Sequence, residues 1–160
     1  MTKHNGTEIQ GMTYNGQEVS TWIHNGVEVF SASEPFYWIQ NSVVQSGYPS
    51  AYNVSSITSG TYYRNFLTGF YMTGNDNGNS TFKGVTNPVS TQRNKYMEVI
   101  VSSLYGGAKK LTIAGTTITA TGTYVIDVRN MDTVTIAVEL TAWAGGSEAG
   151  AGISSIRFYS

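Results

Sequence analysis

The sequence predicts an all-β fold: an antiparallel β-sandwich, most like a jelly roll, preceded by a short region of β-hairpin repeats. Residues that favour strands and turns dominate, since the 160-residue chain contains 20 Thr, 17 Ser, 12 Asn and 18 Gly but only 12% charged residues. Apolar residues recur at every second position in several segments, and no segment keeps a helical period over three turns. Three Asn-Gly pairs within the first 26 residues are the third observation, because Asn-Gly is a strong signal for a tight hairpin turn.

The Asn-Gly pairs belong to three ten-residue units that align without gaps over residues 3–12, 13–22 and 23–32. Each unit carries a ring-bearing residue, then Asn-Gly, a variable residue, a glutamate and an aliphatic residue. A two-residue turn makes each unit a hairpin whose rings and glutamates lie on opposite faces. In the third unit the expected cross-strand pairs are His24 with Val27, Ile23 with Glu28 and Trp22 with Val29.

The ring-bearing face of these hairpins must be covered, because a narrow ribbon of short strands is not stable in water on its own. Either it packs on the rest of its own chain, or it meets copies of itself around a symmetry axis. We favour assembly into a homo-oligomer, and interpret residues 1–33 as a docking or oligomerisation region. The expected assembly face consists of Tyr14, Val19, Trp22, His24 and Val29.

The pattern changes after a small polar linker that ends at Pro35, so the β-sandwich domain is expected to span residues 34–160. Its last strand should return to pair inside a sheet, as in a jelly roll. Residues 144–152 are rich in glycine but lack the Lys-Ser/Thr ending of a phosphate-binding loop, so we interpret them as a long flexible hairpin loop. The expected strands cover residues 36–39, 61–72, 96–102, 110–114, 116–120, 123–128, 134–140 and 153–159.

Aromatic residues are concentrated near the start of this domain, where ten of the chain's 20 lie between residues 36 and 71. Strand alternation sends about half of them into the core, and it points the neighbours Tyr62 and Tyr63 to opposite faces. Some rings must therefore be exposed or covered by a partner. Tyrosine and tryptophan offer a flat apolar face with a polar edge, which suits sugar rings and protein interfaces. The candidate ligand or interface aromatics are Tyr37, Trp38, Tyr62, Tyr63 and Tyr71.

The sequence gives little support for catalysis. His4 and His24 occupy the position that a tyrosine fills in the second repeat, so we interpret both as packing residues rather than general bases. Asp127 and Asp132 flank a tight connection and offer the carboxylate pair of a glycosidase. Ordinary turn chemistry, with Arg129 as a neutralising partner, explains that arrangement better. We therefore expect no enzyme, no catalytic residue and no cofactor.

Charge and composition argue against several other classes. Residues 74–80 are rich in Gly and Asn but supply one carboxylate, Asp76, which is too little charge for a calcium site. Nine Lys and Arg residues are scattered along a chain of formal net charge −1, whereas nucleic-acid binding needs clustered cations. The chain has no run of 18 apolar residues, so no membrane insertion is expected, and residues 1–6 lead into no signal peptide.

The repeat units resemble segments of structural proteins from tailed bacteriophages and prophages, of the tail-fibre, receptor-binding or head-decoration type. The resemblance rests on residues 14–19 and 24–29, which both read ring-Asn-Gly-x-Glu-Val, and it covers roughly residues 3–30. Residues 122–128 and 153–158 are similar in style to jelly-roll domains of phage tails and carbohydrate-binding modules. The resemblance implies a virion component without enzymatic activity, often trimeric, made in the host cytoplasm and assembled without secretion.

Together, these observations predict a phage structural protein, on the tail or decorating the head, that assembles with copies and with other virion proteins. It would display its sandwich outward, with a host-surface glycan as a candidate ligand. The alternative is a free-standing carbohydrate-binding module, and a glycan hydrolase ranks third. The resemblance assigns no sugar-binding residue, because no sugar-binding motif matches.

Overall fold

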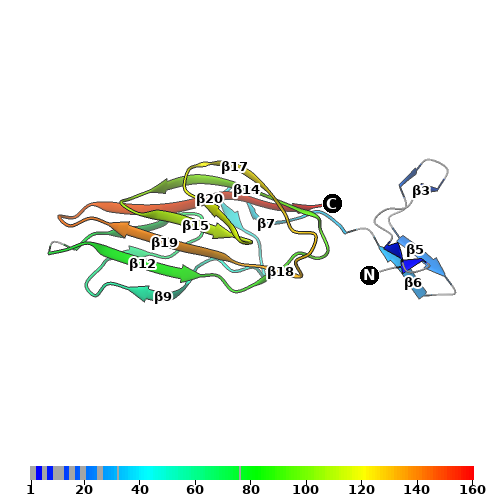
Figure 1. The fold of residues 1–160 in the computed structure, drawn as a ribbon, viewed down its shortest axis with the longest axis horizontal. Coiled ribbons are helices and arrows are strands. Elements are labelled where there is room, and N and C mark those ends of the chain that lie inside the picture. Colours follow the sequence, from blue (N-terminus) through cyan, green and yellow to red (C-terminus); the bar gives the residue numbers. More distant parts are fainter. Residues whose placement is uncertain are drawn as a thin grey trace.

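The structure is a computed structural model that shows an all-β chain (Figure 1). Two sheets pack face to face as a sandwich, and three separate hairpins precede them. The predicted fold class is confirmed. In the part of the chain that is described, no helix has the length and apolar character needed to cross a membrane. The structure describes residues 3–4, 7–8, 13–14, 17–18, 21–24, 27–31, 33–75 and 77–160.

The larger sheet has seven antiparallel strands, with the last strand of the chain at its centre. One long neighbour, β14, runs along one side of β20, and the other side of β20 is shared by β11 and β7. The predicted return of the last strand into the sheet is therefore confirmed. The strands are β7 (Phe36–Gln40), β8 (Val43–Val44), β10 (Tyr63–Arg64), β11 (Phe70–Thr73), β14 (Tyr96–Tyr105), β17 (Gly122–Asp127) and β20 (Glu148–Tyr159).

The smaller sheet has five antiparallel strands in the order β16-β15-β19-β12-β9, so β19 is its central strand. A further two-stranded ladder joins β13 to β18. The strands are β9 (Asn53–Ile57), β12 (Ser80–Val85), β13 (Val89–Ser90), β15 (Lys109–Ile113), β16 (Thr116–Ile118), β18 (Thr133–Val134) and β19 (Ile136–Ala142).

The core lies between the inner faces of the two sheets. Period-two positions point inward and are buried in both layers, as Val99 in β14 and Leu111 in β15 illustrate. Phe70 of β11 and Phe82 of β12 pack across the two layers, with ring centroids 4.3 Å apart. Alternation therefore predicted the inward side of most strands correctly.

The strand predicted over residues 61–72 is wrong, because β10 and β11 are two short strands joined by residues 65–69. This connection is fixed to the body of the protein by hydrogen bonds. The Asn65 side-chain oxygen accepts the Tyr52 N–H at 2.9 Å, and the Leu67 N–H donates to the carbonyl of Ser50 at 2.9 Å. Buried Leu67 then anchors the turn in the core, which an aromatic-rich sequence read as continuous strand does not reveal.

The predicted flexible loop over residues 144–152 is also wrong in its second half. The turn between β19 and β20 covers residues 143–147, and Glu148 to Gly152 belong to β20. Small residues are needed there because other groups pack directly on the strand. A Cβ atom at Gly152 would lie 2.6 Å from the Ser103 hydroxyl and 3.1 Å from the backbone oxygen of Thr68. These glycines permit close packing rather than mobility.

The repeats form three antiparallel hairpins whose registers match the predicted two-residue turns. In the third hairpin, Trp22 pairs with Phe30, so the expected pairing with Val29 is wrong. A bulge between Trp22 and Ile23 adds one residue to the opposite strand, which displaces the register by one. Val19 lies outside the described residues. The strands are β1 (Lys3–His4), β2 (Thr7–Glu8), β3 (Thr13–Tyr14), β4 (Gln17–Glu18), β5 (Thr21–His24) and β6 (Val27–Ser31).

Candidate ligand-binding surface

The five candidate aromatics of the sandwich lie in three different places. Trp38 is completely buried and its indole N–H donates to the carbonyl of Pro49 at 2.8 Å, so its predicted role as an interface residue is wrong. Tyr63 is turned toward the core, with its ring centroid 5.5 Å from that of Phe82. Tyr62 and Tyr71 lie on the outer face of the seven-stranded sheet, whereas Tyr37 lies in a separate cluster at the other end of this sheet.

A cluster on the outer face of the seven-stranded sheet combines three tyrosines with two charged residues. Cross-strand pairing places Arg64 beside Tyr71, and Tyr71 and Tyr105 on either side of Gly150. The Tyr62 ring meets that of Tyr71 edge-on, with centroids 6.4 Å apart. We call this cluster the tyrosine patch and define it as Tyr62, Arg64, Tyr71, Tyr105 and Glu148.

Hydrogen bonds hold the side chains of the tyrosine patch in place. The Tyr71 hydroxyl donates to Glu148 Oε1 at 2.9 Å, and the Thr73 hydroxyl donates to the Tyr71 oxygen at 3.3 Å. Arg64 Nε donates to the Tyr62 hydroxyl at 3.3 Å. Tyr62 and Tyr71 are thus each hydrogen-bonded to a charged side chain, which limits the positions that the rings can adopt.

Gly150 forms the floor beneath one of the rings. A Cβ atom there would lie 2.6 Å from Cε1, Cζ and the hydroxyl oxygen of Tyr105, so this ring rests directly on the bare backbone of β20. Partial burial and the negative charge of Glu148 raise the pKa of Tyr105. Its hydroxyl therefore remains protonated at neutral pH and can donate a hydrogen bond.

The tyrosine patch lies at the end of the sandwich opposite to the point where the chain enters it. Phe36, the first residue of β7, pairs with Phe158 near the end of β20, whereas the patch surrounds Gly150. Eight residues of extended strand separate these positions, or about 26 Å. The turn between β19 and β20, at the left in Figure 1, carries Trp143, which is 59% exposed and packs over Gly107.

A second group of tyrosines lies on the same sheet face, nearer the chain entry, and its rings are covered by arginines. The Arg157 guanidinium lies over the rings of both Tyr37 and Tyr159, at 5.8 and 5.5 Å from their centroids. The Arg129 guanidinium lies 6.0 Å from the Tyr96 centroid. In this cation–π stacking the guanidinium groups occupy ring faces that a ligand would otherwise contact. We call this group the arginine-covered cluster.

One carboxylate of the candidate glycosidase pair, Asp127, has a structural partner. Asp127 forms an ion pair with Arg129, and the Arg129 backbone N–H donates to the same carboxylate at 3.1 Å. The hydrogen bonds from Arg129 lower the pKa of Asp127 to about 2. A carboxyl group with that pKa is ionised at neutral pH and is poorly suited to donating a proton.

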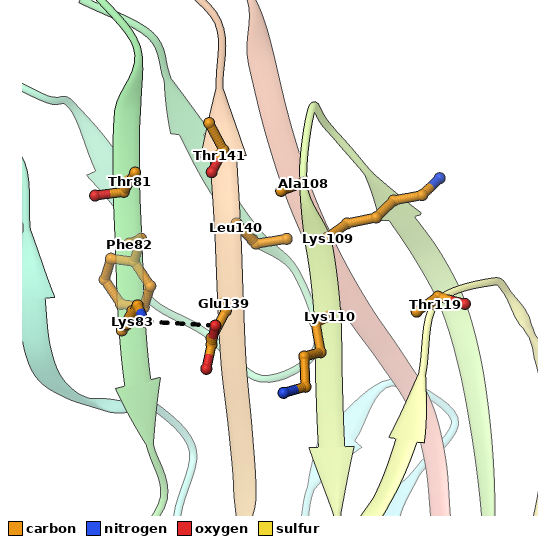
Figure 2. Close-up of a pocket in the computed structure, with 10 residues that line it drawn as sticks. All are labelled: Thr81, Phe82, Lys83, Ala108, Lys109, Lys110, Thr119, Glu139, Leu140 and Thr141. Atoms are coloured by element: carbon orange, nitrogen blue, oxygen red, sulfur yellow. Dashed lines mark ion pairs between the residues drawn. The ribbon is translucent and has the colours of Figure 1, made fainter.

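The outer face of the five-stranded sheet carries a shallow depression of about 300 Å³ (Figure 2). Lys83 Nζ lies 3.5 Å from Glu139 Oε2, and Lys110 stands opposite Glu139 in the register. Lys109 turns away and donates to the carbonyl of Leu104 at 3.2 Å. Cross-strand charges that neutralise one another are a common feature of an exposed sheet, and we do not assign a ligand site to this depression.

Three members of the tyrosine patch, namely Arg64, Tyr105 and Glu148, were missed by sequence reasoning. Irregular register in β14 between Ile100 and Ser103 shifts the alternation, so that Tyr105 points outward although it continues the spacing of buried Val99 and Val101.

Among the described residues, no group of three or more His, Cys, Asp or Glu side chains is arranged to hold a metal ion. Comparisons with protein-family models, with curated proteins and with solved structures find no match to this chain.

Proposed function

We propose that this protein is a non-enzymatic structural component of a bacteriophage particle, on its tail or its head, that displays the sandwich toward a host-surface glycan. The observation that carries the proposal is the separation of two surfaces. The hairpin repeats precede the end of the sandwich where β7 begins, and the tyrosine patch lies about 26 Å away along β20. Attachment at one end and presentation at the other is the arrangement that such a display protein needs.

The attachment role of residues 1–33 is supported by how little pairing the hairpins have. In the described part of the chain, the strands β1 to β6 form ladders only within their own hairpins. Isolated two-stranded ribbons are marginal in water, so they need apolar partners. Copies of the same repeats, closed by threefold symmetry, or other proteins of the particle would supply that cover.

Light scattering coupled to size-exclusion chromatography tests this assembly directly. We expect the full chain to elute as a homotrimer and a variant lacking residues 1–32 to elute as a monomer. Circular dichroism should show that the shortened chain keeps its β structure, because the sandwich core draws on residues from Trp38 onward. A full-length chain that is monomeric at all concentrations would overturn the assembly proposal.

A free-standing carbohydrate-binding module is the second candidate, and the tyrosine patch is the observation that favours it. Such a module would bind sugar as a monomer and would keep its affinity without residues 1–32. A virion protein would instead depend on those residues for incorporation into particles. The two candidates therefore differ in oligomeric state, whatever the ligand of the sandwich is.

A further inference from the structure

We infer that the tyrosine patch is a binding site for neutral oligosaccharides, in which Tyr62 and Tyr105 contact pyranose rings and Glu148 accepts hydrogen bonds from sugar hydroxyls. The inference rests on the proposed display function for the origin of the ligand, a glycan on a host surface. The site itself is argued from the exposure, hydrogen bonding and charge of the patch residues.

The rings of the patch are open to a ligand, in contrast to those of the arginine-covered cluster. Tyr62 is 58% exposed and Tyr105 is 39% exposed, and both lie on the outer side of the seven-stranded sheet. In the arginine-covered cluster, the faces of Tyr37 and Tyr159 are already occupied by Arg157. A flat aromatic face with a polar edge can pack against the apolar C–H side of a sugar ring while its hydroxyl bonds to a sugar oxygen.

Hydrogen-bonding capacity beyond the internal contacts fits a polyol. A carboxylate has about four acceptor positions, and Glu148 uses one of them for the Tyr71 hydroxyl. A guanidinium has about five N–H donors, and Arg64 uses Nε for the Tyr62 hydroxyl. Glu148 can therefore accept from vicinal hydroxyls, while Arg64 donates to sugar oxygens. Both bonds are charge-assisted and stronger than neutral ones.

The charge and size of the patch favour a neutral glycan over an acidic polymer or a protein. Glu148 and Arg64 carry opposite charges that cancel, so the patch presents no excess positive charge to an acidic polysaccharide. Stable protein interfaces bury about 800 Å² on each partner and centre on apolar anchors. The patch instead consists of five side chains, each ending in a hydroxyl or a charged group.

Gly150 sets the position of the Tyr105 ring and thereby the spacing of the site. Any side chain at this position must push the ring away from β20, because the added Cβ would lie 2.6 Å from three of its atoms. Tyr105 is partly exposed and can swing outward. Gly150→Ala should therefore alter the binding surface and leave the fold intact.

A glycan array probed with the full-length chain tests the inference, using neutral hexose and N-acetylhexosamine oligosaccharides beside polymers that contain uronic acid. Isothermal titration with the best neutral oligosaccharide then compares four variants. We expect Tyr62→Ala and Glu148→Gln each to weaken binding roughly tenfold or more, and Gly150→Ala to weaken it severalfold. Tyr37→Ala, in the arginine-covered cluster, is the matched control and should bind within about twofold of the parent chain.

Three outcomes would overturn the inference: no neutral oligosaccharide binds, only acidic polymers bind, or Tyr37→Ala weakens binding as much as Tyr62→Ala. Circular dichroism of each variant separates loss of the site from loss of the fold. The assembly of residues 1–33 is measured independently by light scattering. A trimer that binds no glycan would thus reject the site and leave the structural role standing, whereas a monomer that binds glycan through Tyr62 would do the reverse.

Discussion

The two outer faces of the sandwich are built on central strands of opposite character. On the seven-stranded sheet, β20 presents Glu148, Gly150 and Gly152 outward; the Tyr105 ring lies over Gly150, and the Ser103 hydroxyl lies close to Gly152. On the five-stranded sheet, β19 presents side chains of its own, including Glu139 paired to Lys83. The central strand of a sheet can therefore cover its outer face with its own side chains. Alternatively, glycines in the central strand leave space for an aromatic ring of a neighbouring strand to pack on its backbone.

The two faces also differ in how their polar side chains are arranged. On the five-stranded face, Lys83 and Glu139 form an ion pair across the strands, as Figure 2 shows, and the hydroxyls of Thr58 and Thr81 are hydrogen-bonded at 3.4 Å. On the other face, charged side chains such as Arg64, Glu148 and Arg157 lie among tyrosine rings, which also offer hydroxyl groups to solvent or a ligand.

We expect the largest difference in the free energy of unfolding between a variant at a buried aromatic residue near the seven-stranded sheet and a variant at an exposed one. Trp38→Ala removes a fully buried side chain, and we expect the free energy of unfolding to fall by about 3–5 kcal/mol. Tyr62→Ala removes a ring that is 58% exposed and should change it by about 0.5 kcal/mol or less. Urea denaturation of both variants measures the difference. Equal losses would show that Tyr62 belongs to the core.

The next prediction compares the loss of stability caused by a larger side chain at a glycine of β20 with that caused by the same change at an alanine of β19. Gly152→Val places a branched side chain against the Ser103 hydroxyl and the backbone oxygen of Thr68, and should destabilise the fold by about 1–3 kcal/mol. Ala137→Val is the matched change in β19, where the residue is half-buried between Val85 and Thr112. A β-branched residue suits that position, so a change within about 0.5 kcal/mol is expected. Thermal unfolding of both variants checks the contrast, and a stable Gly152→Val chain would contradict it.

The sequence predicted those parts of the fold in which local pattern and tertiary packing agree. Strands such as β14 and β19 keep apolar residues at every second position, and their inward side chains are buried as expected. By contrast, β12 went unrecognised because its inward positions are Ser80, Phe82 and Gly84, only one of which is large and apolar. Ser80 accepts the N–H of Asn75 in the preceding turn, and Gly84 lies against Tyr52, which is distant in sequence. Both positions therefore need a small residue.

The candidate site was less predictable than the fold, because it depends on register. Two of its tyrosines, Tyr62 and Tyr71, stood out by composition alone. Tyr105 joins them only because irregular register in β14 turns its side chain outward. The sequence predicts that Glu148 lies in a flexible loop, whereas β20 begins at this residue. Bulges and glycines packed under rings are set by partner strands, which a single sequence does not display.

A smaller effect should come from the ion pair on the five-stranded face. Lys83 and Glu139 are both about half exposed, so their attraction is screened by water and salt. A double-mutant cycle with Lys83→Ala and Glu139→Ala should give a coupling free energy of roughly 0.2–1 kcal/mol that shrinks in high salt. A large coupling free energy that persists in high salt would mean that the two charges are shielded from solvent, which would contradict their half-exposed positions.

The smallest effect on stability is expected at the ion pair between Arg129 and Asp127. Arg129 lowers the pKa of Asp127 to about 2 from its ordinary value of 3.8, so the folded state favours the ionised carboxylate. The resulting stabilisation is fully present above the ordinary pKa and is lost as the pH falls through the lowered one. Unfolding measured between pH 2 and 5 should therefore show a shallower loss of stability for Asp127→Asn than for the parent chain. Arg129→Gln should flatten the profile in the same window, because Asp127 then loses the partner that lowers its pKa. Parallel profiles for all three chains would show that ionisation of Asp127 contributes nothing to the pH dependence of stability, contrary to its lowered pKa.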